Sequence, residues 1–490
     1  MKLLRVQLSI IFLLLVSWTA ASFALERPTQ KQIDQYKKDG SLPERQKAAR
    51  AIGNHKMDPA LAAKANYKLR RLAYQAAGKS AKEIDQILPA PPPAWQGMPS
   101  TGDVKMFVLL IEFNEYPHIA ADTQPDVHSR IFGPENTSSS SYPYESLTAY
   151  YDRSSYGLLN LQGATLGWYN AGNRSDVAET DAGREALIMS AINSFDAGGH
   201  DFSQYDNDND GDIDYFAVIW TGPYGAWASF WWGYQTHFGD TSYTIDEKNL
   251  SKYSWQWESD NYPSDIFSPY TLIHETGHAL GLPDYYDYDD TVGPDGGVGG
   301  LDMMHWYGDH NAFSKFVLDW LTPTVISANG TYPGQDLSSS ASTADALLIM
   351  PNASGSPFEE FFMAQHRKRE KNDIGIPTDG LLIWHVDARL DSDGWNYLYN
   401  NSYTEHKLLR LMEADGLEEI EQGDGWADEG DFYTSGKSFT PASSPNSNAY
   451  SGFSTCINVN GITASGNDII CAVAIDEPAP YLPAVLKPLL

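Results

Sequence analysis

The segment "HETGHALGLPD" carries five residues whose types and spacing suit metal chemistry: His274, Glu275, His278, Gly281 and Asp284. On a helix the two histidines lie four positions apart, so both imidazoles point the same way and can bind one metal ion. Glu275 lies about 100° round the helix from His274, where it can reach a water on that ion without binding the ion itself. The pattern predicts metal-assisted hydrolysis, in which zinc lowers the pKa of its water to about 7 and Glu275 takes the proton.

This chemistry needs a helix that ends just after His278. The "SPY" sequence at 268–270 predicts an N-cap followed by a proline at the first helical position. Gly281 can adopt the left-handed conformation that ends a helix, so that Asp284, three positions later, meets the metal from another side. Asp284 is therefore the expected third zinc ligand, with Asp287 as the alternative.

One stripe of this helix is apolar and should pack on the core of its domain; its members are Tyr270, Ile273, Gly277 and Leu280. An amphipathic helix that carries two histidines without a metal is the alternative interpretation. The added glycine and aspartate favour the zinc site.

The full pattern, His-Glu-x-x-His-x-x-Gly-x-x-Asp, resembles the metzincin signature, whose third ligand is usually histidine. Metzincins also carry a methionine in a tight turn beneath the metal. In "GGVGGLDMMHW" (Gly296 to Trp306) the resemblance implies that role for Met304, which matches the family position better than Met303. His305 and Tyr307 follow closely, either to polarise a substrate carbonyl or as partly buried, hydrogen-bonded side chains.

A second metal site is predicted in "DNDNDGDID", where acidic residues occupy positions 1, 3, 5, 7 and 9 of a calcium loop: Asp206, Asp208, Asp210, Asp212 and Asp214. Gly211 stands at position 6 for the sharp turn, and Asp212 would contribute its backbone carbonyl. Position 12 is Ala217 and not the glutamate of an EF-hand. We expect a structural calcium loop of another type; a solvated acidic turn is the alternative.

The elements around the predicted zinc helix indicate an α/β domain. A continuous apolar run at 104–113 predicts a strand buried on both faces, 183–195 has helical periodicity, and 215–222 is again strand-like. In a chain of 490 residues, long enough for two or three domains, we assign residues 98–325 to an α/β (α+β) metzincin-like catalytic domain.

The remainder of the chain reads as short strands separated by turns, as in "GLLIWHVD". This pattern predicts a β-sandwich accessory domain at 326–478, followed by a tail at 479–490. The chain's two cysteines, Cys456 and Cys471, are expected to form one disulfide if the protein is exported, with two free thiols as the alternative.

The N-terminus predicts export. Lys2 and Arg5 precede a short apolar run at 8–16, and small residues end at Ala24, so residues 1–24 read as a cleaved signal peptide. The run is too short to span a bilayer comfortably, and no later stretch reaches about 20 apolar residues, which favours a secreted, extracellular product without a stable membrane anchor. An uncleaved anchor is the alternative.

Residues 25–97 form a basic segment with helical spacing that ends in the Pro-rich "PAPPPAWQG". It holds 14 lysines and arginines against 7 acidic residues, whereas residues 98–490 hold 17 against 57. The acidic body argues against nucleic-acid binding, and a basic leader can dock on it as an inhibitory pro-region. The leader has no cysteine, which excludes a cysteine switch; His55, Asp58 or another carboxylate are the candidate groups with which it could block the site.

Several segments together resemble the secreted immune-inhibitor-A-like metalloproteases: "HETGHALGLPDYYD", "GGLDMMHW", "FSKFVLDWLTP", "YYDRSSYGLLNLQG" and "GLLIWHVD". The similarity runs from about residue 30 to 475. It implies a zinc endopeptidase made as a precursor, with zinc held by His274, His278 and Asp284, and Glu275 as the acid and base. Thr276 departs from the aromatic residue usual in that family, but it is not a ligand.

The sequence therefore predicts a secreted zinc endopeptidase that hydrolyses proteins and peptides, with a structural calcium ion. A β-sandwich adhesion protein with a vestigial metal site is the alternative, and Glu275 argues against it because a structural zinc needs no general base. A thermolysin-like site with a glutamate ligand from a later helix is a further alternative. Gly281 and Asp284 argue against that one.

Overall fold

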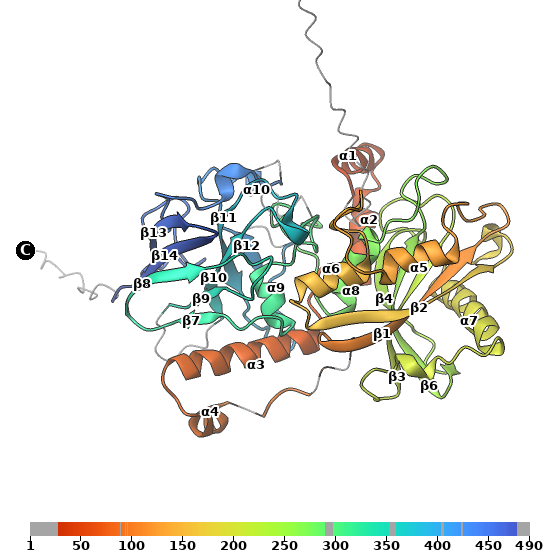
Figure 1. Cartoon of the computed structure of the whole chain (residues 1–490), viewed down its shortest axis with the longest axis horizontal. Coiled ribbons are helices and arrows are strands. Elements are labelled where there is room, and N and C mark those ends of the chain that lie inside the picture. The colour runs from red at the N-terminus through yellow and green to blue at the C-terminus, as the bar shows by residue number, and fades with distance from the viewer. Residues whose placement is uncertain are drawn as a thin grey trace, which may run out of the picture.

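The computed structural model describes residues 28–88, 90–93, 95, 97–289, 297–351, 359–402, 406–422 and 425–477. The predicted signal peptide and the tail at 479–490 lie outside these residues. The described chain has a mixed α/β fold with three β-sheets, arranged as two lobes side by side (Figure 1). Its α-helices are α1 (Gln30–Asp39), α2 (Leu42–Ile52), α3 (Pro59–Ala76), α4 (Ala81–Ile87), α5 (Gln124–Phe132), α6 (Leu147–Ser154), α7 (Asp181–Ala197), α8 (Tyr270–Ala279), α9 (Ala312–Val317) and α10 (Glu419–Gln422).

Four short 3-10 helices complete the helical elements: η1 (Arg174–Asp176), η2 (Ser203–Tyr205), η3 (Lys371–Asp373) and η4 (Glu429–Asp431). Among the described residues, no helix combines the length and the apolar character that a membrane span requires.

The six-stranded sheet forms the scaffold behind α8. Its strands are β1 (Gly102–Glu112), β2 (Leu159–Asn170), β3 (Asp212–Trp220), β4 (Tyr234–His237), β5 (Thr244–Ile245) and β6 (Lys248–Trp257). In the order β2-β1-β3-β6-β4, the first four strands run parallel and β4 pairs with β6 antiparallel at the edge. The central strands β1 and β3 are buried over most of their length, as expected for strands covered on both faces.

The other two sheets share one hydrophobic core. The five-stranded sheet has the order β12-β11-β10-β9-β7, and the three-stranded sheet has the order β13-β14-β8. Their bounds are β7 (Thr324–Ile326), β8 (Gly330–Leu337), β9 (Leu347–Ile349), β10 (Glu360–Arg367), β11 (Gly380–Asp387), β12 (Leu409–Leu411), β13 (Ile457–Ser465) and β14 (Asp468–Ile475). Residues from both sheets form this core, including Ile383, Phe362 and Val473.

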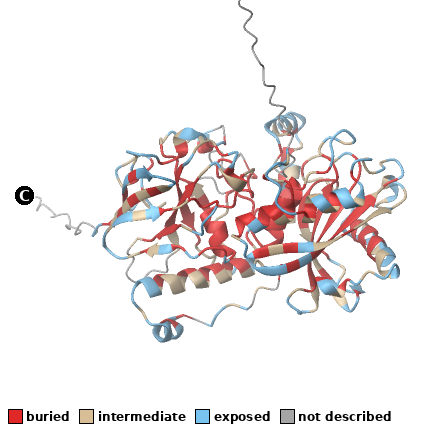
Figure 2. Ribbon diagram, in the orientation of Figure 1, coloured by how far each residue is buried: buried red, intermediate tan, exposed pale blue. Residues whose placement is uncertain are grey.

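The opposite face of the five-stranded sheet packs toward α8. Along β10 and β11, Met363 and Trp384 alternate with the residues that face the core between the two smaller sheets. Met363 and Trp384 belong instead to the same hydrophobic cluster as Ile273 and Met304. Figure 2 shows the result: the elements at the centre of the molecule are buried, and exposed residues lie at its periphery. The two lobes are therefore joined through a common apolar core near α8.

Helices α1, α2 and α3 contact the rest of the protein, whereas α4 packs on α3. In Figure 1, α3 runs along the lower side of the lobe that carries the five-stranded sheet. Lys68 Nζ donates to the Phe316 carbonyl at 2.7 Å, and Lys64 pairs with Asp319 at 2.6 Å. Basic side chains of this N-terminal segment thus contact carboxylates and carbonyls of the body.

The predicted disulfide is not formed. Cys456 lies opposite Asp476 across β13 and β14, since the Asp476 amide donates to the Cys456 carbonyl at 3.0 Å, whereas Cys471 pairs in register with Gln335. Cys471 and Asp476 are five positions apart along this extended segment, a distance of about 16 Å. A disulfide requires Cα atoms within about 7 Å, so this register holds the thiols apart.

Candidate functional site

Helix α8 presents the two histidines predicted to bind zinc. It begins at Tyr270, with Pro269 at the N-cap, one residue later than the sequence predicts. After the helix, Gly281 adopts a left-handed conformation with φ +99°, which confirms the predicted turn. All ten residues of α8 are buried, and not only the predicted apolar stripe.

Backbone carbonyls orient both imidazoles. Nδ1 of His274 lies 2.8 Å from the Met303 carbonyl, and Nδ1 of His278 lies 2.8 Å from the Leu282 carbonyl. A carbonyl oxygen only accepts hydrogen bonds, so Nδ1 carries a proton in each ring, and Nε2 is the nitrogen that can bind a metal. This is the arrangement in which histidine binds a metal through Nε2.

The two Nε2 atoms converge on Asp284. Its Oδ1 lies 3.0 Å from Nε2 of His274 and 3.4 Å from Nε2 of His278, and ligand atoms of all three residues lie within 4.8 Å of one another. With bonds of about 2.0–2.1 Å, two ligand atoms of a tetrahedral zinc site lie about 3.3 Å apart. The three donors therefore fit a zinc ion.

Two contacts hold Asp284 in place. Its backbone amide donates to the Asn54 carbonyl at 2.8 Å, and the Tyr288 hydroxyl donates to Oδ2 at 2.5 Å. Burial raises the pKa of Asp284, but His278 and His274 beside it hold the pKa below its usual value. The group is thus an ionised oxygen donor.

Asp287 lies elsewhere. Its Oδ1 accepts from the Asp289 amide at 2.7 Å, and the residue lines a small cavity of about 30 Å³ together with Leu42 and Gln46 of the N-terminal segment. The structure brings Asp284, and not Asp287, to the two histidines.

Glu275 is fully buried beside this group. Neither carboxylate oxygen has a hydrogen-bond partner among the described residues. A buried carboxylate without a partner is costly, so a polar ligand such as a water molecule is needed beside it. Its neighbour Thr276 donates to the Leu272 carbonyl at 2.7 Å and takes no part in the group.

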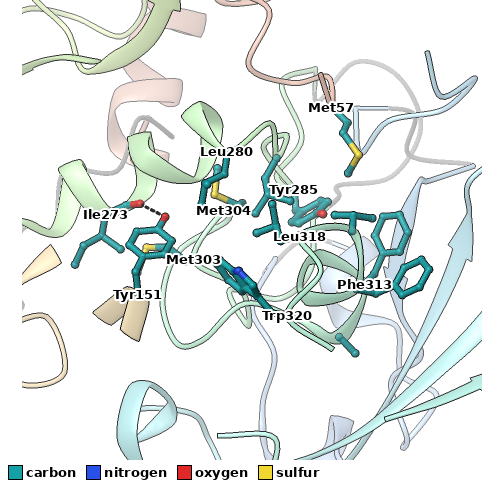
Figure 3. Close-up of a cluster of buried hydrophobic side chains, with 14 of the residues drawn as sticks. Met57, Tyr151, Ile273, Leu280, Tyr285, Met303, Met304, Phe313, Leu318 and Trp320 are labelled. Carbon is teal, nitrogen blue, oxygen red and sulfur yellow. Dashed lines mark hydrogen bonds between the residues drawn. The ribbon is translucent and has the colours of Figure 1, made fainter. Parts of the chain in front are cut away.

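The loop that carries Met303 and Met304 supports α8 from below. Both methionines lie in the same cluster as Ile273, whose carbonyl accepts from the Tyr151 hydroxyl at 2.7 Å (Figure 3). The fit against Gly277 is close: a Cβ atom there would lie 2.3 Å from Sδ of Met304. Met304 thus packs directly on the turn of α8 between the two histidines.

Gly277→Ala should therefore destabilise the protein. The added methyl group overlaps Met304 in a fully buried site, and overpacking of this kind costs about 1–3 kcal/mol. We expect a lower midpoint of urea unfolding together with weaker zinc binding. Gly375→Ala is the matched control, because a Cβ atom there meets nothing within 4 Å. Equal stability of the two variants would contradict this packing.

His305 and Tyr307 hold the same loop. Nδ1 of His305 accepts from the amides of Val298 at 3.0 Å and Gly300 at 3.3 Å. The amide of Tyr307 donates to the Gly300 carbonyl at 3.2 Å, and burial raises the pKa of its hydroxyl. These contacts favour the structural alternative over a role in polarising substrate.

Sequence reasoning missed the groups that orient this site. The Asp302 carboxylate accepts from the amides of Met304 at 2.7 Å and Asn311 at 2.6 Å and so shapes the loop. Tyr288 lies four residues after Asp284, a spacing that could have drawn attention to it. Asn54 carried no signal, because its contact is made by the backbone.

The predicted calcium loop is assembled in part. Asp206, Asp208 and Asp210 bring carboxylate oxygens within 4.8 Å of one another, and Gly211 turns with φ +104°. Lys248 pairs with Asp206 at 2.7 Å. The three carboxylates of the loop are therefore close together. Lys248 offsets part of their negative charge.

Asp212 and Asp214 use their side chains differently. Oδ1 of Asp212 accepts from Asn249 Nδ2 at 2.8 Å, and Oδ2 of Asp214 accepts from Asn207 Nδ2 at 2.7 Å. Burial raises the pKa of Asp214 to about 7. Among the described residues, the carboxylates of Asp212 and Asp214 do not join the group formed by Asp206, Asp208 and Asp210.

Residues 53–58 of the N-terminal segment cover the zinc-site turn. The Asp58 amide donates to the Gly281 carbonyl at 2.9 Å, and the Asp58 carboxylate pairs with Lys252 of β6 at 3.0 Å. The His55 ring lies 5.3 Å from that of Tyr288. Between this segment, β4 and His278 lies a cavity of about 220 Å³.

Comparison with known proteins adds no assignment: no family model matches the chain, and neither does any curated protein.

Proposed function

We propose that the protein is a secreted zinc endopeptidase of the metzincin type, made as a precursor. The observation that carries the proposal is the convergence of Nε2 of His274, Nε2 of His278 and a carboxylate oxygen of Asp284 beside the buried Glu275. A purely structural zinc would favour a fourth protein ligand and would need no carboxylate at this place. Three ligands with a carboxylate alongside are typical of hydrolytic sites.

Each residue has a defined task. His274, His278 and Asp284 would hold zinc, which when bound lowers the pKa of a water molecule and polarises a substrate carbonyl. Glu275 accepts the proton of the attacking water and delivers it to the leaving amine.

The substrate would take the place now held by residues 53–58. That segment lies between α8 and the edge strand β4, and it lines the cavity that reaches His278. An edge strand offers unpaired backbone groups to an extended peptide. We therefore expect the substrates to be extended segments of proteins or peptides.

The test is hydrolysis of casein by the full chain after limited trypsin treatment, which should remove the Lys- and Arg-rich N-terminal segment, and after complete inhibition of the trypsin with a serine-protease inhibitor. 1,10-Phenanthroline should abolish cleavage, and added zinc should restore it. Cleavage that resists the chelator would contradict a zinc mechanism.

We further propose that residues 25–97 are an inhibitory pro-region. Asp58→Asn tests this, because asparagine caps α3 as well as aspartate does but loses the charge that pairs with Lys252. Loss of one partner of a largely buried pair costs about 2 kcal/mol, roughly a 30-fold rise in the undocked population. We expect a corresponding rise in casein cleavage by the unprocessed chain.

Asp85→Asn is the control for this experiment. It removes the same charge from the same segment, but Asp85 pairs with Arg71 within the segment and is 61 % exposed. If the two variants show the same residual activity, the contact between Asp58 and Lys252 does not maintain latency.

The loop of Asp206, Asp208 and Asp210 is proposed as a structural calcium site. Three carboxylates on one tight turn supply the oxygen donors that calcium prefers. The ion would replace Lys248 as the counter-charge of Asp206.

A further inference from the structure

A second group of carboxylates lies in the other lobe, in the loop that follows β12. It consists of Glu413, Asp415, Glu419 and Asp431, whose carboxylate oxygens lie within 4.8 Å of one another. Glu413 and Asp415 follow β12, Glu419 is the first residue of α10, and Asp431 is the last residue of η4. We call this group the acidic pocket.

Two of the four members of the acidic pocket are buried, and the other two are partly exposed. Glu413 is 2 % exposed and Asp431 is 1 % exposed. Oε2 of Glu419 and Oδ1 of Asp431 have no hydrogen-bond partner among the described residues, whereas the Glu413 carboxyl group lies in hydrogen-bond contact with Glu421. Buried carboxylate oxygens need a partner, because burial removes the water that solvates their charge.

The neighbouring cations are engaged elsewhere. Lys407 pairs with Glu421 at 2.6 Å, and Arg410 pairs with Glu418 at 3.2 Å. In the described part of the chain, no lysine or arginine lies within ion-pairing distance of the acidic pocket. Burial raises the pKa of Glu413 to about 10 and that of Asp431 to about 7, so the charge of these carboxylates has to be offset either by protons or by a cation from solution.

We propose that the acidic pocket binds a calcium ion. All four donors are oxygens, which calcium prefers, and calcium accepts about 6–8 oxygen ligands in a flexible arrangement. Magnesium demands near-ideal octahedral geometry and is usually bound by one or two carboxylates with several waters, so a group of four carboxylates favours calcium.

A glycine makes room for one of the donors. A Cβ atom on Gly430 would lie 2.3 Å from Oδ2 of Asp415, so any larger residue would displace this carboxylate. Oδ1 of Asp415 accepts a hydrogen bond from the Leu417 amide at 3.0 Å, which turns Oδ2 of Asp415 toward η4. The backbone is thus shaped around the carboxylates.

The ion would tie down a segment that rests on the methionine loop beneath the zinc helix. Between Glu419 and Asp431, the Ala427 amide donates to the Gly299 carbonyl at 2.9 Å. A Cβ atom on Gly299 would lie 2.7 Å from Cβ of Ala427.

Trp426 makes the second contact with that loop. Its ring lies 5.6 Å from the ring of His305 and 5.2 Å from that of Trp306. A Cβ atom on Gly300 would lie 2.7 Å from the Trp426 ring. Calcium in the acidic pocket would therefore hold the segment that covers the loop of Met303 and Met304.

The experiment counts calcium ions bound to the full chain by equilibrium dialysis with ⁴⁵Ca²⁺. Glu413→Gln together with Asp431→Asn should bind one ion fewer than the unmodified protein. Asp415→Asn alone, a milder change at a partly exposed residue, should lower the affinity for the same calcium ion. Circular dichroism establishes that each variant is folded, and a folded double variant that binds as many ions as the unmodified protein would overturn the proposal.

Two comparisons separate this site from others. Glu418→Gln removes a charge from the same loop outside the acidic pocket and should leave the ion count unchanged. Asp210→Asn acts on the loop of the first lobe and should leave the ion in the acidic pocket in place. If Asp210→Asn abolished all calcium binding, the acidic pocket would not be a site.

Amide hydrogen exchange tests the link to the methionine loop. Removal of calcium should accelerate exchange in residues 297–306 of the unmodified protein. In Glu413→Gln with Asp431→Asn, exchange there should be fast with or without calcium. Exchange that does not respond to calcium in the unmodified protein would contradict the link between the two loops.

Discussion

Glu275→Gln should lower casein cleavage by about 10²–10⁴-fold while leaving zinc content unchanged. Glutamine has nearly the same shape but cannot take a proton from water, and Glu275 supplies no ligand atom to the group of His274, His278 and Asp284. A neutral amide also costs less to bury than a carboxylate, so thermal stability should not fall. Steady-state cleavage rates and zinc per chain, measured on the same trypsin-treated sample, check all three points.

The control is Glu258→Gln, which changes another buried glutamate, just after β6. Oε1 of Glu258 accepts from the Ile119 amide at 2.8 Å, and the amide oxygen of glutamine can do the same. Burial raises the pKa of Glu258 to about 8, so at neutral pH it is already largely uncharged. The Glu258→Gln variant should cleave casein at the rate of the unmodified protein. If Glu275→Gln kept zinc and cleaved casein at the normal rate, the proposed role of Glu275 would be wrong.

Asp284→Ala should abolish stable zinc binding. Only two imidazoles remain after the change, whereas catalytic zinc sites have three protein ligands. We expect the loss of affinity to exceed the roughly 10–100-fold effect typical of groups that only orient a ligand. Zinc per chain after dialysis against a metal-free buffer is the measurement, with casein cleavage falling in parallel.

Two further variants define the site around Asp284. Tyr288→Phe removes the hydroxyl that donates to Oδ2 of Asp284 and should weaken zinc binding about 10–100-fold. Asp287→Ala is the matched control, because this carboxylate accepts from the Asp289 amide and lies beside Leu42. Zinc retained by Asp284→Ala but lost by Asp287→Ala would show that the third ligand is misassigned.

Local patterns in the sequence predicted much of the secondary structure. The apolar run at 104–113 corresponds to β1, the periodic segment at 183–195 to α7, and "GLLIWHVD" to β11 residue for residue. These elements depend on side-chain spacing along a short stretch of chain, which the sequence displays directly. The disulfide depended on the register of two strands, and pairing of Cys471 with Gln335 separates the two thiols.

The complete burial of α8 could not be predicted from the local sequence. The sequence predicts one apolar stripe, yet every residue of the helix is buried. On the turn that follows the helix, a Cβ atom on Gly281 would lie 2.9 Å from a Leu61 methyl and 3.0 Å from the Trp95 ring. Both residues belong to the N-terminal segment, far away in sequence. No periodicity within α8 could have predicted that cover.

The sequence by itself determined the donors of the candidate zinc site, because the spacing of His274 and His278 on a helix and the turn at Gly281 are local geometry. Only the tertiary structure decided what orients them: the Met303 carbonyl at His274 and the Tyr288 hydroxyl at Asp284. It also assembled the acidic pocket, whose members span residues 413 to 431 and have no motif spacing. The physical reason is that these groups meet through the packing of loops, which depends on the whole core and not on any one segment.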